Sequence, residues 1–222
     1  RRGYRLAQGE APIKETLAAS LIRLANWKGD TPLIDPFCGS GTIAIEACLI
    51  AQNIAPGFNR EFVSEQWNIM PANIYDDYRD EADKMADYDK EIEVYASDID
   101  PEMVEIAKRN AEEVGLSDII KFSVKDVNTL TIDTEEPVAL IGNPPYGERI
   151  GDREEVEEMY RYIGKLMKQH PFLSTYILTS NKEFEYLVDR KATKRRKLFN
   201  GYIECTYYQY WGKKTERKTI EN

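Results

Sequence analysis

The stretch Leu33–Thr42 constrains the fold of this chain more than any other segment. It reads Leu-Ile-Asp-Pro-Phe-Cys-Gly-Ser-Gly-Thr, so a short apolar segment runs into a carboxylate, a proline and two glycines. The small and apolar residues that follow, 43–50, predict a helix. Because Gly39 and Gly41 lack a Cβ atom, the backbone before this helix can take positive φ values and approach a ligand closely. The stretch therefore predicts a strand, a ligand-binding loop and a helix.

Three classes of ligand use such a loop. A phosphate-binding loop requires Lys before the Ser or Thr, and residues 39–42 contain none. A dinucleotide site fits Gly39, Gly41 and Ala44 weakly, but its ribose-binding acid should follow about 20 residues later, and the first acid after a second predicted strand, Asp98, lies far beyond that spacing. S-adenosylmethionine (AdoMet) carries a cationic ammonium group that suits a carboxylate at the strand end, Asp35. The dinucleotide and AdoMet readings therefore remain.

A second motif, Asn143-Pro144-Pro145-Tyr146, follows the apolar segment Val138–Ile141. Together with the first motif, it resembles class I AdoMet-dependent methyltransferases, and among them the enzymes that methylate exocyclic amines of nucleobases. The resemblance implies AdoMet as the cofactor. It also implies a Rossmann-like α/β fold, with a mostly parallel seven-stranded sheet, helices on both faces and an antiparallel C-terminal strand.

The beginning of the chain extends this resemblance. The stretches RRGYR and APIKETLA are similar to the segment before the methyltransferase domain in THUMP-domain ribosomal RNA large-subunit guanine-N2 methyltransferases, and the DPFCGSGT, DID and NPPYG stretches agree. We therefore expect a lead-in segment and helix at residues 1–30 and the methyltransferase domain at 31–222. Residues 56–90 are expected to form an insertion of one or two surface helices. The family's upstream THUMP RNA-binding domain is expected to belong to a longer protein.

Polar residues are predicted to end four strands. Because ligands of open parallel sheets lie at the carboxyl ends of the strands, Asp35, Asp98, Asp126 and Asn143 are expected around one site. The resemblance implies that Asp98 accepts hydrogen bonds from the ribose hydroxyls and Asp126 from the adenine amine, with Ile99 and Val127 on the adenine faces. The predicted cofactor-binding residues are Asp35, Phe37, Cys38, Gly39, Ser40, Gly41, Thr42, Asp98, Ile99, Asp126, Val127 and Asn143.

The predicted catalytic residues are Asn143, Pro144, Pro145 and Tyr146. An exocyclic amine is a poor nucleophile because its lone pair is delocalised into the ring. If the Asn143 side-chain oxygen and the Pro144 carbonyl accept the amine protons, the nitrogen moves toward sp³ and its lone pair points at the methyl group. The prolines fix the backbone, and Tyr146 is expected to stack on a flipped-out base. This chemistry requires no metal, and no metal is expected.

Charge is unevenly distributed along the chain. The formal net charge of −9 argues against a protein that binds nucleic acid over its whole surface. Residues 61–91 hold ten acids and three bases, whereas 191–197 is basic at five of seven positions. Within that run, Lys194, Arg195, Arg196 and Lys197 are either RNA phosphate contacts or part of a solvated turn. The Asn-Gly pair at 200–201 predicts a hairpin.

The leading hypothesis is transfer of a methyl group to guanine N2 in 23S ribosomal RNA. The alternatives are a tRNA guanine-N2 methyltransferase, a DNA adenine-N6 methyltransferase, a cofactor-binding scaffold without catalysis and an NAD oxidoreductase. The intact second motif argues against the scaffold, and the spacing to Asp98 argues against NAD. Three cysteines without CxxC spacing favour neither zinc nor a disulfide framework. Without a signal peptide or a membrane-spanning apolar run, a cytoplasmic protein with no membrane partner is expected.

Overall fold

A computed structural model describes residues 2–4, 13–58, 60–71, 73–147 and 153–213. One seven-stranded sheet runs through it in the order β3, β2, β1, β4, β5, β7, β6. The first five in that order pair in parallel, and β7 is antiparallel to both neighbours. This confirms the predicted fold class. The bounds are β1 Leu33–Asp35, β2 Val94–Asp98, β3 Ile120–Val124, β4 Val138–Gly142, β5 Leu173–Thr179, β6 Lys194–Asn200 and β7 Ile203–Tyr210.

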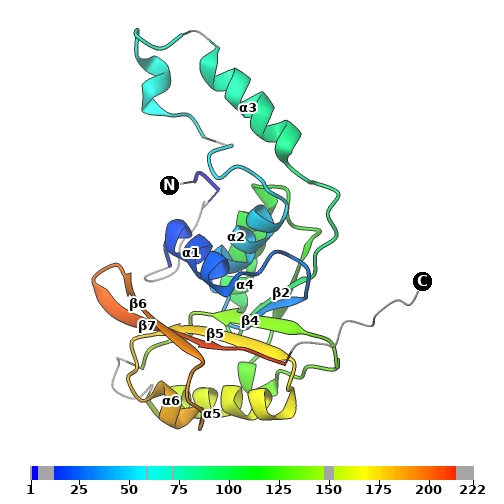
Figure 1. The fold of residues 1–222 in the computed structure, drawn as a ribbon, viewed down its shortest axis with the longest axis vertical. Coiled ribbons are helices and arrows are strands. Elements are labelled where there is room, and N and C mark those ends of the chain that lie inside the picture. The colour runs from blue at the N-terminus through cyan, green and yellow to red at the C-terminus, as the bar shows by residue number, and fades with distance from the viewer. Residues whose placement is uncertain (1, 5–12, 59, 72, 148–152, 214–222) are drawn as a thin grey trace, which may run out of the picture.

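Helices cover both faces of the sheet (Figure 1). On one face lie α1 (Glu15–Ala25), α2 (Thr42–Ala51) and α4 (Pro101–Glu112), and on the other lie α5 (Arg153–Gln169) and α6 (Phe184–Leu187). Each layer buries its own apolar cluster, the first around Leu21 and Ile45 and the second around Tyr160 and Phe184. The hydrophobic burial on both faces explains why β4 is buried along its whole length.

The order of the strands positions the site. Strand β1 pairs with β2 on one side and with β4 on the other, so the chain order reverses at β1. In open α/β sheets the ligand crevice lies beyond the carboxyl ends of the strands at such a reversal. Asp35 and Asp98 end β1 and β2, and Asn143 follows β4. The predicted site residues therefore meet at one edge of the sheet.

Helix α4 begins and ends as its sequence predicts. The Asp100 side chain accepts a hydrogen bond from the Glu102 N–H at 2.8 Å, and Pro101 occupies the first helical position. After the helix, Gly115 has φ +69°, a left-handed conformation that suits glycine. These local signals hold the loop that carries Asp98 and Ile99 against the start of α4.

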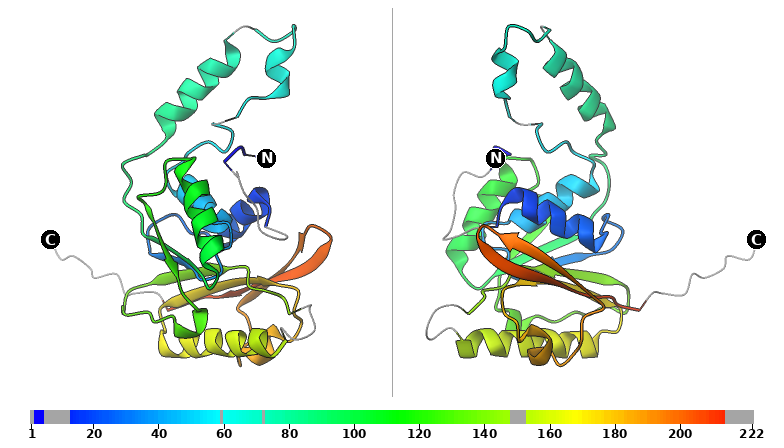
Figure 2. Two further views of the ribbon diagram at one scale, coloured as in Figure 1. Left: turned by 180° about the vertical axis from the view of Figure 1, so that it is seen from behind. Right: turned by 60° about the vertical axis from the view of Figure 1, so that its left-hand side comes forward.

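The 56–90 segment contains the short 3₁₀ helix η1 (Val63–Gln66) and α3 (Ile74–Met85). No residue of α3 is buried, and the helix projects away from the body (Figures 1 and 2). One or two surface helices are thus found where they were expected. The division of the chain into residues 1–30 and 31–222 remains a prediction.

The lead-in segment contacts α2. Arg2 forms an ion pair with Glu46, and the Tyr4 hydroxyl donates to the same carboxylate at 2.8 Å. Burial raises the pKa of Glu46 to about 7, although Arg2 opposes this shift. Residues 1 and 5–12, which carry part of the RRGYR and APIKETLA resemblance, lie outside the described residues.

The end of the chain differs from the prediction in one respect. Lys194–Lys197 is neither a turn nor a loop, because it forms the first half of β6, which pairs with β7 in a hairpin. The predicted antiparallel C-terminal strand is β7, and β6 beyond it runs parallel to the first five strands. The Asn-Gly turn signal is confirmed, with Gly201 at φ +63° between the strands. Figure 2 shows the hairpin extending beyond the helical layers. None of the helices in the described ranges has the length and apolarity needed to cross a membrane.

Candidate functional site

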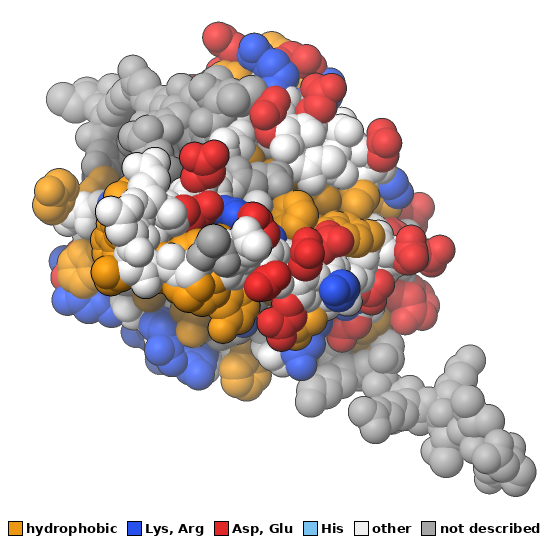
Figure 3. Space-filling model, turned by 90° about the horizontal axis from the view of Figure 1, so that it is seen from above, with side chains coloured by type: hydrophobic (Ala, Val, Ile, Leu, Met, Phe, Trp, Pro, Cys, Tyr) orange, Lys and Arg blue, Asp and Glu red, His pale blue; other side chains and the backbone are white. Residues whose placement is uncertain are grey.

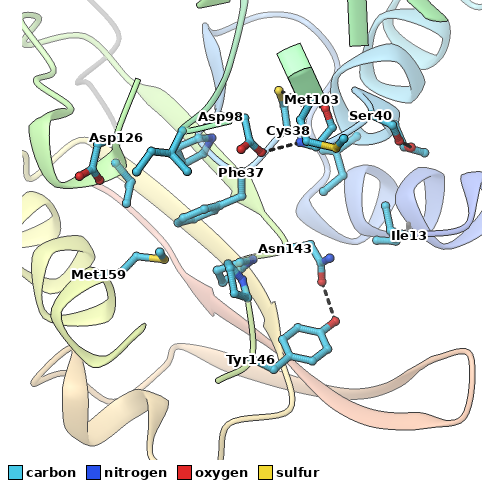
Figure 4. A pocket seen from close by; sticks show the side chains of 18 of the residues that line it. Ile13, Phe37, Cys38, Ser40, Asp98, Met103, Asp126, Asn143, Tyr146 and Met159 are labelled. Carbon is cyan, nitrogen blue, oxygen red and sulfur yellow. Dashed lines mark hydrogen bonds between the residues drawn. The ribbon is translucent and has the colours of Figure 1, made fainter. Parts of the chain in front are cut away.

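A cavity of about 590 Å³ opens at the carboxyl ends of the strands. Figure 4 shows Asp98 and Asp126 in one part of it, and Asn143 turned toward Tyr146 in another. The structure thus brings together the two motifs that the sequence separates. The predicted residues that line the cavity are Phe37, Cys38, Gly39, Ser40, Thr42, Asp98, Ile99, Asp126, Val127, Asn143, Pro144, Pro145 and Tyr146.

Asp98 organises the glycine loop. Its Oδ2 atom accepts a hydrogen bond from the Gly39 N–H at 2.9 Å, and its Oδ1 atom accepts one from the Asp100 N–H at 3.0 Å. Each carboxylate oxygen can accept a second hydrogen bond, so both remain able to accept from ligand hydroxyls. Asp98 therefore fits the predicted ribose contact and also fixes the loop that lies beside it.

Glycine is required at position 41 for a reason visible in the structure. Gly41 has φ +81°, and a Cβ atom there would lie 3.0 Å from the Ala107 Cβ of α4. Gly39 also has positive φ, at +49°, but a Cβ atom there would meet nothing within 4 Å. Gly39 lines the cavity and Gly41 does not. Gly41 thus allows α2 and α4 to pack closely, whereas Gly39 presents bare backbone to a ligand.

Asp35 does not line the cavity. Its side chain is fully buried, with Oδ1 accepting from the Phe37 N–H at 3.2 Å and Oδ2 without a hydrogen-bond partner among the residues that the structure describes. Burial, assisted by the nearby charge of Asp98, raises the pKa of Asp35 to about 8. The expected direct contact between Asp35 and a ligand ammonium is therefore not formed by this arrangement, because the carboxyl group lies beneath the loop.

The adenine end of the predicted site is assembled from β2 and β3. Val127 is buried at 4% exposure, while Ile99 is 68% exposed, and both line the cavity. Asp126 begins the short 3₁₀ helix η2 (Val127–Thr129) and accepts from the Asn128 N–H at 2.9 Å through Oδ1. Two apolar side chains and one carboxylate are the groups that an adenine ring with an exocyclic amine requires. This arrangement fits the predicted roles.

Tyr146 lines the cavity, and its hydroxyl is tied to the neighbouring residues. Its hydroxyl donates to Asn143 Oδ1 at 2.6 Å and accepts from Asn200 Nδ2 at 3.2 Å, and its ring packs against the α1–α2 side of the core (Figure 4). The Tyr146 hydroxyl thus supports Asn143, and stacking of its ring on a flipped-out base stays a prediction. Asn143 Oδ1 keeps a second lone pair, so it can still accept a hydrogen bond from a substrate amine.

The carbonyl groups of Pro144 and Pro145 differ in their hydrogen bonds. The Tyr160 hydroxyl of α5 donates to the Pro145 carbonyl at 2.9 Å and also pairs with Thr179 Oγ1 at 2.9 Å. Within the described ranges the Pro144 carbonyl has no hydrogen-bond donor. The motif is thus anchored from α5 at Pro145, and Pro144 is the carbonyl available to a ligand.

Cysteine and metal chemistry receive no support from this site. Cys38 is buried, and burial together with the charges of Asp35 and Asp98 raises the pKa of its thiol far above the ordinary value. In the part of the chain that the structure describes, no group of three or more His, Cys, Asp or Glu side chains is arranged to hold a metal ion. Cys38 therefore serves as a small packing residue in the loop.

The four basic residues of β6 do not line the cavity. Arg195 pairs with Glu185 at 2.8 Å, and Lys197 pairs with Glu204 at 2.6 Å. The side chains of Lys194 and Arg196 have no ion pair or hydrogen bond among the described residues. The run therefore consists of two neutralised and two unneutralised cations, a distinction that the sequence does not show.

Several lining residues were not predicted. The second-motif end of the cavity includes Asn200 and Ile203 from the β6–β7 hairpin, and α5 contributes Met159. Their sequence carries no signal for this role, because only the register of β6 on β7 brings the hairpin turn to the cavity. The remaining unpredicted lining residues are Ile13, Pro36, Ile43, Met103, Lys125 and Gly147.

A comparison with protein families decides the assignment. Residues 2–209 match the model of the RMKL-like methyltransferase domain. The chain belongs to this family. AdoMet is therefore its cofactor, as the sequence predicted, and the loop, Asp98 and the η2 wall provide groups that suit it.

Relatives of this RMKL-like domain are longer proteins. It is 55% identical over its whole length to YpsC of Bacillus subtilis, to which an RNA methyltransferase role has been provisionally given, and spans 58% of that protein. It is 41% identical to the ribosomal RNA large subunit methyltransferase K/L of Shewanella frigidimarina, where the match covers 94% of the chain and 30% of the relative.

Two solved structures share the fold closely. SMU.472, crystallised with S-adenosylhomocysteine (SAH), is 44% identical with a TM-score of 0.91, and the match covers 97% of this chain and 56% of that one. A Listeria monocytogenes protein named as a predicted N6-adenine-specific DNA methylase is 51% identical with a TM-score of 0.90, covering 96% of this chain and 55% of that one. The names of these relatives agree on methyl transfer and disagree on the substrate.

Proposed function

We propose that this domain transfers a methyl group from AdoMet to the exocyclic N2 of a guanine in 23S ribosomal RNA, as part of a longer cytoplasmic protein with an upstream THUMP domain. The observation that carries the proposal is the position of Asn143 and Pro144, which line the same cavity as Gly39 and Asp98. The K/L relative, named for ribosomal RNA, supports the substrate class.

The residues of the second motif act on the nucleophile. Asn143 Oδ1 and the Pro144 carbonyl accept hydrogen bonds from the two amine N–H groups, which directs the nitrogen lone pair toward the methyl group. After transfer, the methylated nitrogen loses one proton to solvent. Bound AdoMet supplies this methyl on a sulfonium, a good leaving group. The Tyr146 and Tyr160 hydroxyls hold Asn143 and Pro145 in place. Most of the acceleration comes from this orientation, which is worth several kcal/mol.

The cofactor is held by the loop and the adenine wall. Asp98 accepts from the ribose hydroxyls, and Asp126 accepts from the adenine amine between Ile99 and Val127. The Asp98→Ala variant is expected to bind AdoMet at least about tenfold more weakly, a loss of roughly 1.4 kcal/mol. Calorimetry measures this loss directly.

Asp100→Ala is the matched control for Asp98. It removes the same charge two positions away, from an exposed side chain that caps α4 and does not line the cavity. If both variants weaken AdoMet binding equally, the effect is one of local charge or loop stability, and the ribose assignment is wrong.

Methylation of adenine N6 in DNA is the second candidate, because one close structure bears that name and an adenine amine fits the same acceptors. A tRNA guanine-N2 enzyme differs only in the RNA that it captures. Mass spectrometry can map the modified nucleotide in RNA and DNA from a deletion strain and from the same strain after complementation. This measurement separates the ribosomal RNA, tRNA and DNA candidates. Loss of one N2-methylguanine from 23S RNA is expected. Loss from tRNA, or of N6-methyladenine from DNA, would contradict the proposal.

A further inference from the structure

The tip of the β6–β7 hairpin is a surface that the proposed amine and cofactor contacts leave unused. Asn200 and Ile203, which line the cavity, lie on either side of a turn formed by Gly201 and Tyr202. Tyr202 is fully exposed, with a relative accessibility of 104%. An aromatic ring that buries nothing within the domain, directly at the rim of a substrate cavity, is available to a ligand.

The register of the hairpin divides β6 into two faces. Directly opposed residues share a face, and Arg196 lies opposite Tyr207, which is buried and donates through its hydroxyl to the Leu21 carbonyl of α1 at 3.0 Å. Lys194, Arg196 and Asn200 therefore share the α1 side of the sheet. Arg195, Lys197 and Phe199 share the other side, where Arg195 reaches Glu185 of α6. Only the first face continues to the cavity.

Charge follows the same division. The cations of the second face are neutralised by Glu185 and Glu204, whereas Lys194 and Arg196 on the cavity side have no acidic partner within the described residues. Figure 3 shows Lys and Arg side chains gathered mainly on the left, where Figure 1 places the hairpin, and Asp and Glu side chains predominating elsewhere. The chain as a whole carries a net charge of −9, so the cations at the hairpin form a local positive region that suits a polyanion.

We propose that the α1-side face of β6 and the hairpin tip bind an unpaired RNA segment, with Tyr202 stacked on a base next to the methylated nucleotide and Arg196 and Lys194 on its phosphates. The proposal rests on the proposed function and identifies how that substrate is held. Residues rise about 3.3 Å each along a strand, so Arg196 and Lys194 lie about 13 and 20 Å from Asn200. An extended strand of RNA leaving the cavity follows this line, and stacking tolerates any base.

The hairpin tip is also connected to the amine site. Asn200 donates to the Tyr146 hydroxyl, which donates to Asn143 Oδ1. RNA bound at the tip therefore lies beside the residue that orients the catalytic amide, and the base held by Tyr202 helps to set the position of its neighbour in the cavity.

The test of stacking uses Tyr202→Ala and Tyr202→Trp in the complete gene product, with an unmodified transcript of large-subunit ribosomal RNA as the probe. Tyr202→Ala is expected to weaken RNA binding about tenfold, the order of one lost base–aromatic stack. Tyr202→Trp is expected to restore binding, with its added fluorescence quenched by the RNA. Phe199→Ala, which removes a 55% exposed ring from the opposite face, is the control and is expected to bind normally.

The test of the phosphate contacts compares Arg196→Gln with Arg195→Gln, which remove the same charge from opposite faces. Arg196→Gln is expected to reduce the slope of log affinity against log salt by about 0.7, one single-strand phosphate contact, and Arg195→Gln to leave the slope unchanged. AdoMet affinity, measured by calorimetry, is expected to be the same in all five variants.

The outcomes separate the two proposals. If the wild-type protein methylates ribosomal RNA while Tyr202→Ala and Arg196→Gln behave like their controls, the hairpin assignment is overturned and the proposed function stands. If the wild-type protein transfers no methyl group to RNA, the proposed function is overturned, and the hairpin assignment with it.

Discussion

Asn143→Ala is expected to reduce single-turnover methylation at least about a hundredfold while changing AdoMet affinity by no more than a few-fold. The amide oxygen holds an amine proton at the moment of transfer, so its contribution belongs to the transition state rather than to the cofactor complex. A hundredfold is the order lost when one polar contact to a transition state is removed. Rapid-quench methylation with saturating AdoMet measures the first quantity, and calorimetry measures the second.

The control for Asn143 is set by its hydrogen bond. Asn143→Ala also leaves the Tyr146 hydroxyl without its acceptor, so a loss of activity alone does not distinguish contact with substrate from support of the loop. Tyr146→Phe removes the same hydrogen bond but keeps the Asn143 oxygen, and is expected to lose no more than about tenfold, the cost of one ordinary hydrogen bond. Equal losses in the two variants would make Asn143 structural. Loss of AdoMet binding in Asn143→Ala would have the same meaning.

Asp35→Asn is expected to change how the stability of the cofactor-free protein depends on pH. Asp35 has a pKa of about 8 in the folded protein, raised chiefly by burial, against an ordinary value near 3.8. Between these values the folded state holds a proton that the unfolded state has released. Stability is therefore greatest below about pH 4 as far as this group is concerned, and falls as pH rises to about 8, by up to about 1.4 kcal/mol per pH unit.

Because Asn resembles the neutral acid, the Asp35→Asn variant should differ least from the wild type at or below about pH 4 and exceed it by several kcal/mol near pH 8. Urea unfolding at a series of pH values measures the difference. Asp118→Asn, which changes an exposed acid after α4, should follow the wild-type curve. Parallel curves for Asp35→Asn and the wild type would show that Asp35 is ionised in the folded protein.

The sequence predicted the parts of the site that depend on local signals. Asp98 and Asn143 follow short apolar segments, and parallel strands place such ends at one edge without any knowledge of side-chain packing. The cap of α4 at Asp100 and the turn at Gly201 are local in the same sense. The second motif added the chemistry, although its roles were drawn from a family resemblance rather than from the residues themselves.

The predictions that differed depend on contacts between distant segments. Asp35 is buried because the loop folds over it. The residues of the first motif do not indicate how exposed to solvent its carboxyl group is. The link from Asn200 of the hairpin to the Tyr146 hydroxyl, which itself donates to Asn143, was likewise not predicted. A strand at Lys194–Lys197 could not be predicted, because four consecutive cations show no alternation of polar and apolar residues. Pairing with β7 reveals that alternate cations differ in their partners.

Strand β6 is also an edge strand of the sheet, although it precedes β7 in the sequence. This position gives its charges a second effect. An outer strand presents unpaired backbone groups to which another strand can add, and the four cations Lys194–Lys197 oppose such addition by repelling a second copy of the same edge. If all four charges were removed together, a loss of RNA binding could therefore result from edge-to-edge self-association as well as from missing phosphate contacts. Single substitutions preserve most of this repulsion. The charges of Lys194–Lys197 thus oppose self-association in addition to any role in binding a ligand.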